Sequence, residues 1–376
     1  MTNLIQATGT GILLSLFAIS VHAELKALDD AALSDVTGQA YLQIDQYQRP
    51  ADTSVDYVRA QFGLEVETQI SADVMELGKY PRWDEKRNDW EIQEADILIE
   101  NFAMGHIYDE TYYLLNPLMP KPVKSDGSAY QNGEIVPFRM IDPYIEFAFE
   151  EINGKTTPVG LRIGYGKAEG MMSGNILSLT GAVHSTVRTN ADYIANQVGA
   201  CDLAAELCAK LALEPLLGSV EIVNGADLVY GEDTTPSHLV GEIDEARAMY
   251  TGVKNGDTLR AETGLTSVEL AAQNCVVVAV DVCFPLTQYQ SLWVGARDEN
   301  GNLAGPAEGM FLSFQTRPLQ WNQNFKAGNT PESYMQAVQG AFLNVPAGVL
   351  EMDTLSATLG TSRARTEYID RGVGLF

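Results

Sequence analysis

Apolar and polar residues alternate along much of the chain, and this period of two is typical of β-strands with one covered face. Within residues 61–68, Leu64 and Val66 fall on one side of the expected strand and glutamates fall on the other. The same alternation recurs at 40–47, 95–105, 144–150, 159–166, 291–297 and 310–316. Turn pairs such as Asn132-Gly133 and Asn153-Gly154 separate some of these stretches, as expected for hairpins.

Two further stretches complete the β pattern. Glycines are frequent in residues 164–174, which predicts short strands joined by tight corners. Residues 276–282 are valine-rich and predict one strand. The chain is therefore predicted to be mainly β, folded as an antiparallel sandwich or a solenoid-like curled sheet with an α/loop insertion.

The expected insertion covers residues 190–274, where the pattern changes. Segments 192–198 and 202–217 are rich in Ala and Leu with helical spacing, and 268–273 predicts a further helical turn. We expect the β-rich part at 24–189 and the β-rich part at 275–376 to form one domain around this insertion.

Residues 1–23 resemble an export signal, because they contain no charged residue and carry an apolar run at 11–20 that ends near Ala23. A run of this length is too short for a membrane-spanning helix, which needs about 20 apolar residues. A buried N-terminal helix is the alternative. The sequence thus predicts a signal peptide cleaved after Ala23, and a mature protein in the periplasm, at the outer-membrane surface or outside the cell.

The net charge of the chain excludes some classes of function. The 376 residues include 24 Lys and Arg against 50 Asp and Glu, which gives a formal net charge of −26. A chain this acidic repels phosphate groups, so we expect neither nucleic-acid binding nor binding to anionic membranes through a basic patch.

The four cysteines are even in number, as expected in an oxidising compartment. A helix over Cys201–Cys208 would separate its ends by about 10 Å, and one strand over Cys275–Cys283 would separate its ends by about 26 Å. Both spans exceed the Cα separation of about 7 Å that a disulfide tolerates. If both segments are regular, the bridges join one segment to the other. If either segment turns back, local pairs are possible.

No motif for catalysis or cofactor binding is present in the sequence, so we predict a protein that is not an enzyme and holds no cofactor or metal. The histidines after residue 23 are His106, His184 and His238, which lack ligand spacing. An outer-membrane β-barrel or barrel-associated protein is the main alternative, because strands alternate and the chain ends in Phe376. A periplasmic hydrolase is the third.

Two segments carry a family resemblance: LDDAALSDVTGQ at 28–39 and RARTEYIDRGVGLF at 363–376, with weaker support from 63–68, 77–80 and 162–170. In these segments the chain resembles exported gammaproteobacterial pilus-system proteins of the FilA type. The resemblance implies a secreted, β-rich, surface or pilus-associated component, and it supplies no catalytic residue.

The sequence therefore predicts an exported, disulfide-containing cell-surface protein with a structural or adhesive role in a pilus-like, fimbrial system. Its expected partners are other surface or pilus-system proteins, or further copies of itself. A sheet edge or the last strand would pair with a partner chain. The candidate assembly residues are Arg363, Arg365, Tyr368, Arg371 and Phe376. We expect the arginines to form salt bridges on the last strand, with docking on an acidic neighbour as the alternative.

Overall fold

A computed structural model describes the fold. It describes residues 41–50, 52–84, 88–91, 93–116, 119–183, 186–190, 219–222, 227–231, 239–244, 246–262, 267–277, 280–297, 303–323, 330, 333–346, 351–353 and 361–367. The predicted signal peptide at 1–23, Cys201, Cys208 and the segment 368–376 lie outside these residues.

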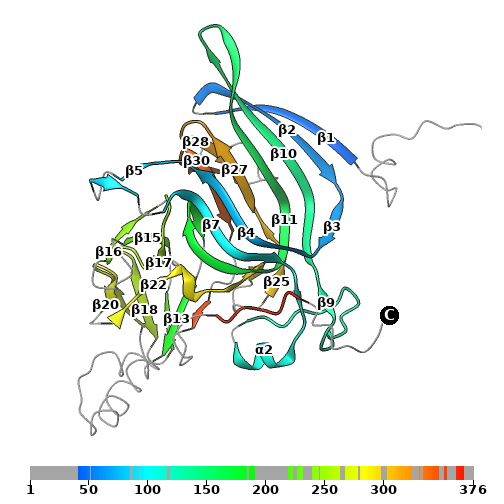
Figure 1. Ribbon diagram of the computed structural model, residues 1–376, viewed down its shortest axis with the longest axis vertical. Coiled ribbons are helices and arrows are strands. Elements are labelled where there is room, and N and C mark those ends of the chain that lie inside the picture. The colour runs from blue at the N-terminus through cyan, green and yellow to red at the C-terminus, as the bar shows by residue number, and fades with distance from the viewer. Residues whose placement is uncertain are drawn as a thin grey trace, which may run out of the picture. The chain divides into compact units, whose positions relative to one another are not determined.

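A large, strongly curled sheet of twelve strands is the largest sheet among the described residues (Figure 1). Its main path runs β1-β2-β10-β11-β27-β30-β12, with every pair antiparallel except β30 and β12. These strands are β1 (Tyr41–Arg49), β2 (Asp52–Gly63), β10 (Phe138–Ile152), β11 (Lys155–Leu179), β27 (Phe311–Gln315), β30 (Gly340–Val345) and β12 (Gly181–Val183). The strands beside this path are β3 (Glu65–Thr68), β4 (Ile70–Lys79), β7 (Ala95–Met104), β23 (Ser291–Val294) and β26 (Ala307–Glu308).

Strand β11 holds two parts of this sheet together. Its first half pairs with β10 and β27, and its second half pairs with β7 and β23. The expectation of short strands with tight corners at 164–174 is wrong, because this segment lies inside one strand of 25 residues. Gly170 has a φ of +138°, a conformation that side chains rarely allow, so the strand can curl here without ending.

Two smaller sheets take most of their strands from residues 190–274, where the sequence predicts an α/loop insertion. One contains β13 (Thr186–Asn190), β14 (Ser219–Ile222), β18 (Thr258–Glu262), β19 (Ser267–Ala271) and β31 (Glu351–Asp353). The other contains β15 (Asp227–Gly231), β16 (Leu239–Ile243), β17 (Tyr250–Gly252) and β22 (Cys283–Pro285). The helical turn predicted at 268–273 is wrong, since β19 pairs along its whole length with β18. Segments 192–198 and 202–217 lie outside the described residues.

The segment between Cys275 and Cys283 turns back on itself. Strands β20 (Val276–Val277) and β21 (Val280–Asp281) pair as a hairpin, so the expectation of a single strand is wrong. This fold brings the two Cα atoms to 5.3 Å, and Cys275 and Cys283 form a disulfide. The local pair, which the sequence allowed only if the segment folded back, is therefore the one formed.

The remaining elements are short. Two-stranded pairs are β5 (Trp83–Asp84) with β6 (Asp89–Trp90), β8 (His106–Ile107) with β9 (Ile135–Val136), β24 (Ala296–Arg297) with β25 (Leu303–Gly305), and β28 (Leu319–Asn322) with β29 (Tyr334–Ala337). The helix α2 covers Glu110–Leu115, and a single 3-10 turn, η2, covers Leu286–Gln288. Asp109 caps α2 by accepting from the Thr111 amide.

A buried ion pair fastens the four-stranded sheet to the large one. The Arg247 guanidinium lies 3.0 Å from Asp96 Oδ1, and Arg247 also donates to the Gln93 and Tyr80 carbonyls. Asp96 in turn accepts from the Ala341 amide at the start of β30. A side chain at Gly340 would overlap the Asp96 carboxylate, which explains the glycine at this position.

The prediction of a mainly β protein is confirmed. The periodic stretches at 40–47, 95–105, 144–150 and 159–166 all form strands of the large sheet. The main hydrophobic core lies where β7, the second half of β11, β23 and β30 pack with β15 and β22. This core includes Ile97, Ile99, Leu179, Leu228, Leu292 and Leu343.

Candidate functional site

One row of apolar side chains crosses six strands of the large sheet. The register pairs Ile44 of β1 with Ala60 of β2, and continues through Ile145 and Ile163 to Leu312 and Leu343. A parallel row runs from Gln46 through Val58, Phe147, Leu161 and Phe314 to Ala341. Residues paired across neighbouring strands point to the same face, so the two rows form one continuous apolar face.

The exposure of this face changes along the row. Leu343 at the β30 end is 7% exposed and belongs to the main core, whereas Ile163 is 41% exposed and Ile44 at the β1 end is 67% exposed. The layer that covers the β30 end therefore does not extend over the first four strands. We call the uncovered part the open face; it consists of Leu42, Ile44, Val58, Ala60, Ile145, Phe147, Leu161 and Ile163.

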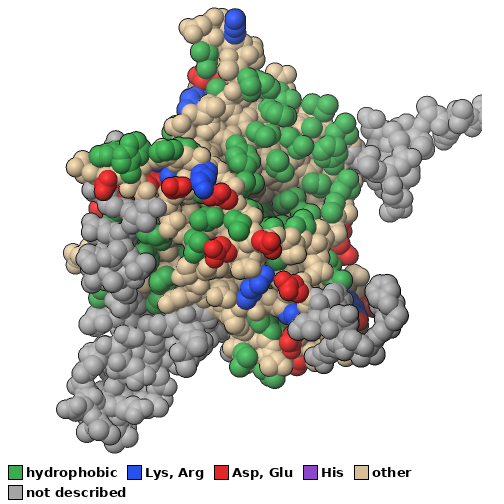
Figure 2. Space-filling view, viewed as in Figure 1, with side chains coloured by type: hydrophobic (Ala, Val, Ile, Leu, Met, Phe, Trp, Pro, Cys, Tyr) green, Lys and Arg blue, Asp and Glu red, His purple; other side chains and the backbone are tan. Residues whose placement is uncertain are grey.

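Figure 2 shows the open face as a broad hydrophobic area over β1, β2, β10 and the first half of β11. Its five most exposed residues are Leu42, Ile44, Ile145, Phe147 and Ile163. If a fully exposed side chain of this size presents roughly 190 Å², these five leave on the order of 450 Å² of apolar surface in contact with solvent. A contiguous apolar patch of this size matches the largest patch on a typical soluble monomer, and such patches are often functional.

A groove runs along the covered border of the open face. It has a volume of about 390 Å³ and lies between Gly78 near the end of β4 and the side chains of Phe147, Leu161 and Phe314. None of its eleven lining residues, all within the described part of the chain, is charged. The groove can therefore bind apolar groups, and its one hydroxyl, that of Thr316, donates to the Val159 carbonyl over 3.3 Å.

The opposite face of the same strands carries a buried charged cluster. Glu146 of β10 and Arg162 of β11 are 0% exposed, and Arg162 Nε donates to Glu146 Oε2 over 2.7 Å. Arg59 of β2 approaches the other carboxylate oxygen at 3.2 Å. A buried charge is tolerated only when it is paired and hydrogen-bonded, and this cluster meets that condition.

Aromatic rings enclose the Arg162 guanidinium. Its carbon atom lies 4.9 Å from the Phe311 ring centre, 5.0 Å from Trp321 and 5.2 Å from Tyr144. The Arg162 Nη1 donates to the Asn322 carbonyl over 2.8 Å. These contacts come from three other strands, so Arg162 ties β10, β27 and β28 to β11.

Tyr47 extends this cluster to the edge strand β1. Its hydroxyl donates to Glu146, and its ring stacks on Tyr57 at a centre distance of 5.1 Å. Burial, followed by the negative charge of Glu146, raises the pKa of Tyr47, so the phenol keeps its proton and remains a donor. The covered face of these strands therefore holds the charged cluster beside a second apolar cluster that includes Val55, Ala148 and Val159, and the open face holds aliphatic residues and Phe147.

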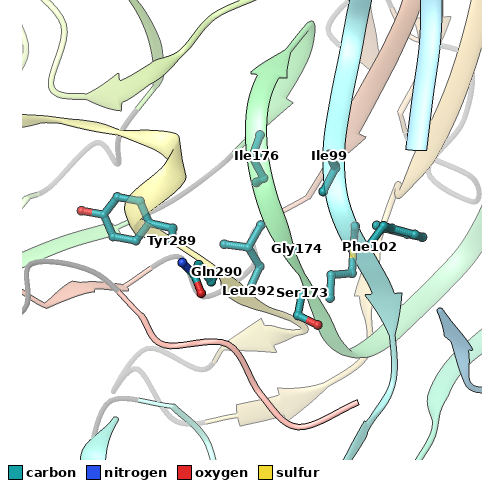
Figure 3. Close-up of a pocket in the computed structure, with 9 residues that line it drawn as sticks. Ile99, Phe102, Ser173, Gly174, Ile176, Tyr289, Gln290 and Leu292 are labelled. Carbon is teal, nitrogen blue, oxygen red and sulfur yellow. The ribbon is translucent and has the colours of Figure 1, made fainter. Parts of the chain in front are cut away.

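A second pocket is too small for a ligand. It lies where β11 passes between β7 and residues 289–292, with Ile99 and Ile176 on facing strands (Figure 3). Its volume is about 10 Å³, enough for about one water molecule. A side chain at Gly174 would overlap Ile99, so the close approach of β11 and β7 requires glycine here.

Other binding chemistry is sparse in the described part of the chain. It contains no group of three or more His, Cys, Asp or Glu residues placed to hold a metal ion. It also contains no helix that is long and apolar enough to span a membrane. His106 is buried, its Nε2 lies 2.7 Å from the Tyr113 hydroxyl, and burial lowers its pKa to about 4.

Two of the predicted assembly residues lie in an extended segment that is anchored to the body. Arg363 Nη2 donates to the Asn101 carbonyl over 3.0 Å, and the Ile107 amide donates to the Arg365 carbonyl over 2.7 Å. Arg365 Nε donates to the Glu367 carbonyl over 3.1 Å. Both arginines are thus held by backbone carbonyls, whereas we expected salt bridges. Tyr368, Arg371 and Phe376 lie outside the described residues.

The sequence analysis named none of the open-face residues. Alternation identified Ile145 and Phe147 as members of one face of a strand, and Glu146 as a member of the other. It could not show which face is covered. A usable signal is the apolar pattern of β1, in which Leu42 and Ile44 alternate with Gln43 and Asp45, because it continues the same face onto an edge strand.

Comparison with known proteins identifies one family. Residues 1–107 match a family of unknown function, DUF6160. The matched region ends at β8 and so includes β1, β2, β4 and β7 but neither β10 nor β11. Neither the curated proteins nor the solved structures gave a significant match to the chain.

Proposed function

We propose that this chain is an exported cell-surface protein with a structural or adhesive role, associated with a pilus-like system, and that it binds a neighbouring protein through the open face. The observation that supports this proposal is the exposure of one apolar face of β1, β2, β10 and β11 to solvent. Arg59, Glu146 and Arg162 are buried on one face of these strands, while Ile44, Ile145, Phe147 and Ile163 on the other face are exposed. Such a face loses its contact with water when another protein covers it.

Three further observations support this function. The Cys275–Cys283 disulfide fits an oxidising compartment. The sequence at 1–23 resembles a signal peptide, and the ends of the chain resemble FilA-type pilus-system proteins. The groove beside the open face is apolar and uncharged, which suits binding better than catalysis.

The test of this proposal is where the native protein is found and what it touches there. Cells are separated into sheared surface material, culture medium, periplasm and outer membrane, and the mature N-terminus is identified by mass spectrometry in each fraction. The proposal predicts recovery from Glu24 onward in the sheared or released material. Recovery only in the outer-membrane pellet, or only as a soluble periplasmic pool, would contradict it.

A matched pair of variants links this location to the open face. Phe147→Asp places a charge in the open face, and Leu114→Asp places the same charge on α2, where Leu114 is 70% exposed. We expect Phe147→Asp to be exported but lost from the surface fraction, and Leu114→Asp to behave like the unchanged protein. Equal recovery of both variants would show that the surface location of the protein does not depend on the open face.

A further inference from the structure

Strand β4 offers a sheet edge next to the open face. Among the described strands, β4 pairs with β7 alone, so the backbone groups along its other edge are available to another strand. It begins one residue after β3, at one end of the large sheet, and Gly78 near its other end lines the groove with Phe147 and Leu161. Figure 1 shows β4 crossing in front of the large sheet, with β7 on one side.

A strand added to this edge would extend the layer formed by β7 and β4 over the open face. Alternate side chains of such a strand would point at Ile145, Phe147 and Ile163, which are 38%, 41% and 41% exposed. Sheet edges next to apolar grooves bind extended segments in this way, with backbone bonds for affinity and alternate side chains for selectivity.

The charges on and around β4 limit which segments can bind at its free edge. Asp73 is exposed on β4, Glu76 pairs there with Lys79 over 2.9 Å, and the whole chain carries a net charge of −26. An acidic strand would be repelled, whereas a strand with alternate apolar residues and a basic residue would be attracted.

Residues 368–376, YIDRGVGLF, carry the required apolar alternation, because Ile369, Val373 and Leu375 would fall on one side of an extended segment. Arg371 would fall on that side as well, and Asp370 on the other. Nine extended residues span about 30 Å, close to the roughly 33 Å of the ten-residue β4. The preceding segment is fixed to the body, because Gln69 donates to the Thr366 carbonyl over 3.3 Å and Ile107 donates to the Arg365 carbonyl.

We propose that residues 368–376 of one copy pair with the free edge of β4 of a second copy and place Ile369, Val373 and Leu375 on its open face. The inference rests on the proposed function and identifies the partner of the open face as another copy of the chain. Because donor and acceptor are different surfaces, the contact repeats from copy to copy and builds an open chain.

Two variants of the mature protein separate donor from acceptor. The first lacks residues 368–376 and keeps β4 and the open face. The second carries Phe147→Asp and keeps the donor segment. Light scattering across a concentration series should show extended association for the unchanged protein and monomers for each variant alone. A one-to-one mixture of the variants should form a dimer that grows no further.

A peptide of residues 368–376 gives an independent measurement that does not depend on a folded Phe147→Asp variant. The labelled peptide should bind the truncated protein saturably, and the intact protein should compete with it. A peptide with Val373→Asp should bind at least tenfold more weakly. Leu114→Asp, introduced into the truncated protein, serves as the control and should bind the peptide normally.

Three results would overturn the inference. Association of the truncated protein with itself would mean that the open face meets a second copy without the donor segment. A strictly monomeric intact protein whose residues 368–376 resist proteolysis would mean that the segment covers its own chain. Failure of the peptide to bind would remove the segment as the occupant. In each case recovery of the native protein from surface material would still support the proposed function.

Discussion

The two ends of one apolar row show how much the environment of a strand can differ within a single sheet. At the β30 end, Leu343 is 7% exposed and packs in the main core, whereas Ile44 at the β1 end is 67% exposed. The strands between them are continuous in register. The row is thus built for burial along its whole length but is covered only at one end, which is the arrangement expected when a partner supplies the missing cover.

The two ends also differ in what lies behind them. The strands of the open face are backed by the Arg59, Glu146 and Arg162 cluster together with an apolar cluster that includes Val55 and Val159, whereas the covered end is backed by Phe311 and Phe342 of that apolar cluster. Directional hydrogen bonds and cation–π contacts hold the open strands in register without help from the exposed side. The open face can therefore stay ordered when no partner is bound.

The largest predicted effect on stability comes from removing the negative charge of Glu146 from the buried cluster. Glu146→Gln should lower the free energy of unfolding by about 3 to 5 kcal/mol, because two buried guanidinium groups lose their counter-charge. Urea unfolding monitored by tryptophan fluorescence measures this loss. As a control, replacing Arg59, Glu146 and Arg162 together with Met, Leu and Met should recover most of the stability. A loss below about 1 kcal/mol for Glu146→Gln would contradict the role given to the cluster.

A matched pair of isoleucines compares the two environments directly. Ile97→Ala in the main core should cost about 2 to 5 kcal/mol, since Ile97 is 0% exposed and a cavity would form. Ile44→Ala in the open face should change stability by no more than about 0.5 kcal/mol. Both values come from the same urea experiment. Similar losses at the two positions would show that the open face is covered in the isolated protein.

Lowering the pH should reduce the free energy of unfolding through protonation of His106. Its pKa is lowered from 6.5 to about 4 in the folded protein, so the unfolded chain binds a proton first as the pH falls. The contribution of neutral His106 is complete above pH 6.5 and is lost between pH 6.5 and 4, and it amounts to about 3 kcal/mol. The difference between the unchanged protein and His106→Gln, followed across this range, isolates the effect. A constant difference would contradict it.

Removal of the disulfide should lower the free energy of unfolding by less than the core and cluster substitutions above. Closing a loop of about nine residues stabilises by up to about 2.5 kcal/mol in the chain-entropy description. Replacing Cys275 and Cys283 together with Ser should therefore cost no more than this amount. The loss should appear first as faster hydrogen exchange in β17 and β22, which pair beside the bridge. Faster exchange in β10 and β11 alone would show that the open strands depend on the bridge.

Much of the large sheet could be predicted from period-two alternation, as at 61–68 and 144–150. The curled course of β11 could not, because glycines at 164, 166, 170 and 174 are equally compatible with corners and with a bend inside a strand. The strand β19 could not either. Residues 267–271 have helical composition, and pairing with β18 overrides this local preference.

The open face was beyond prediction for a different reason. Alternation assigns Ile145 and Phe147 to one side and Glu146 to the other, and the usual expectation is that the aliphatic side is buried. Here Glu146 is buried, because Arg162 and Arg59 from neighbouring strands meet it. The Arg59 pairing depends on register between segments about 90 residues apart, and the Arg162 pairing on register between β10 and β11, neither of which the alternation of a single strand contains.

The most direct test of the account is hydroxyl-radical footprinting of the open face in native surface material and in the purified, dilute mature protein. Phe147 is 41% exposed and reports on the open face, and Trp83 is 47% exposed and serves as the reference outside it. The account predicts strong protection of Phe147 in the surface material, with oxidation of Trp83 unchanged. Equal oxidation of Phe147 in both samples would contradict the claim that this face is where the protein binds its neighbour.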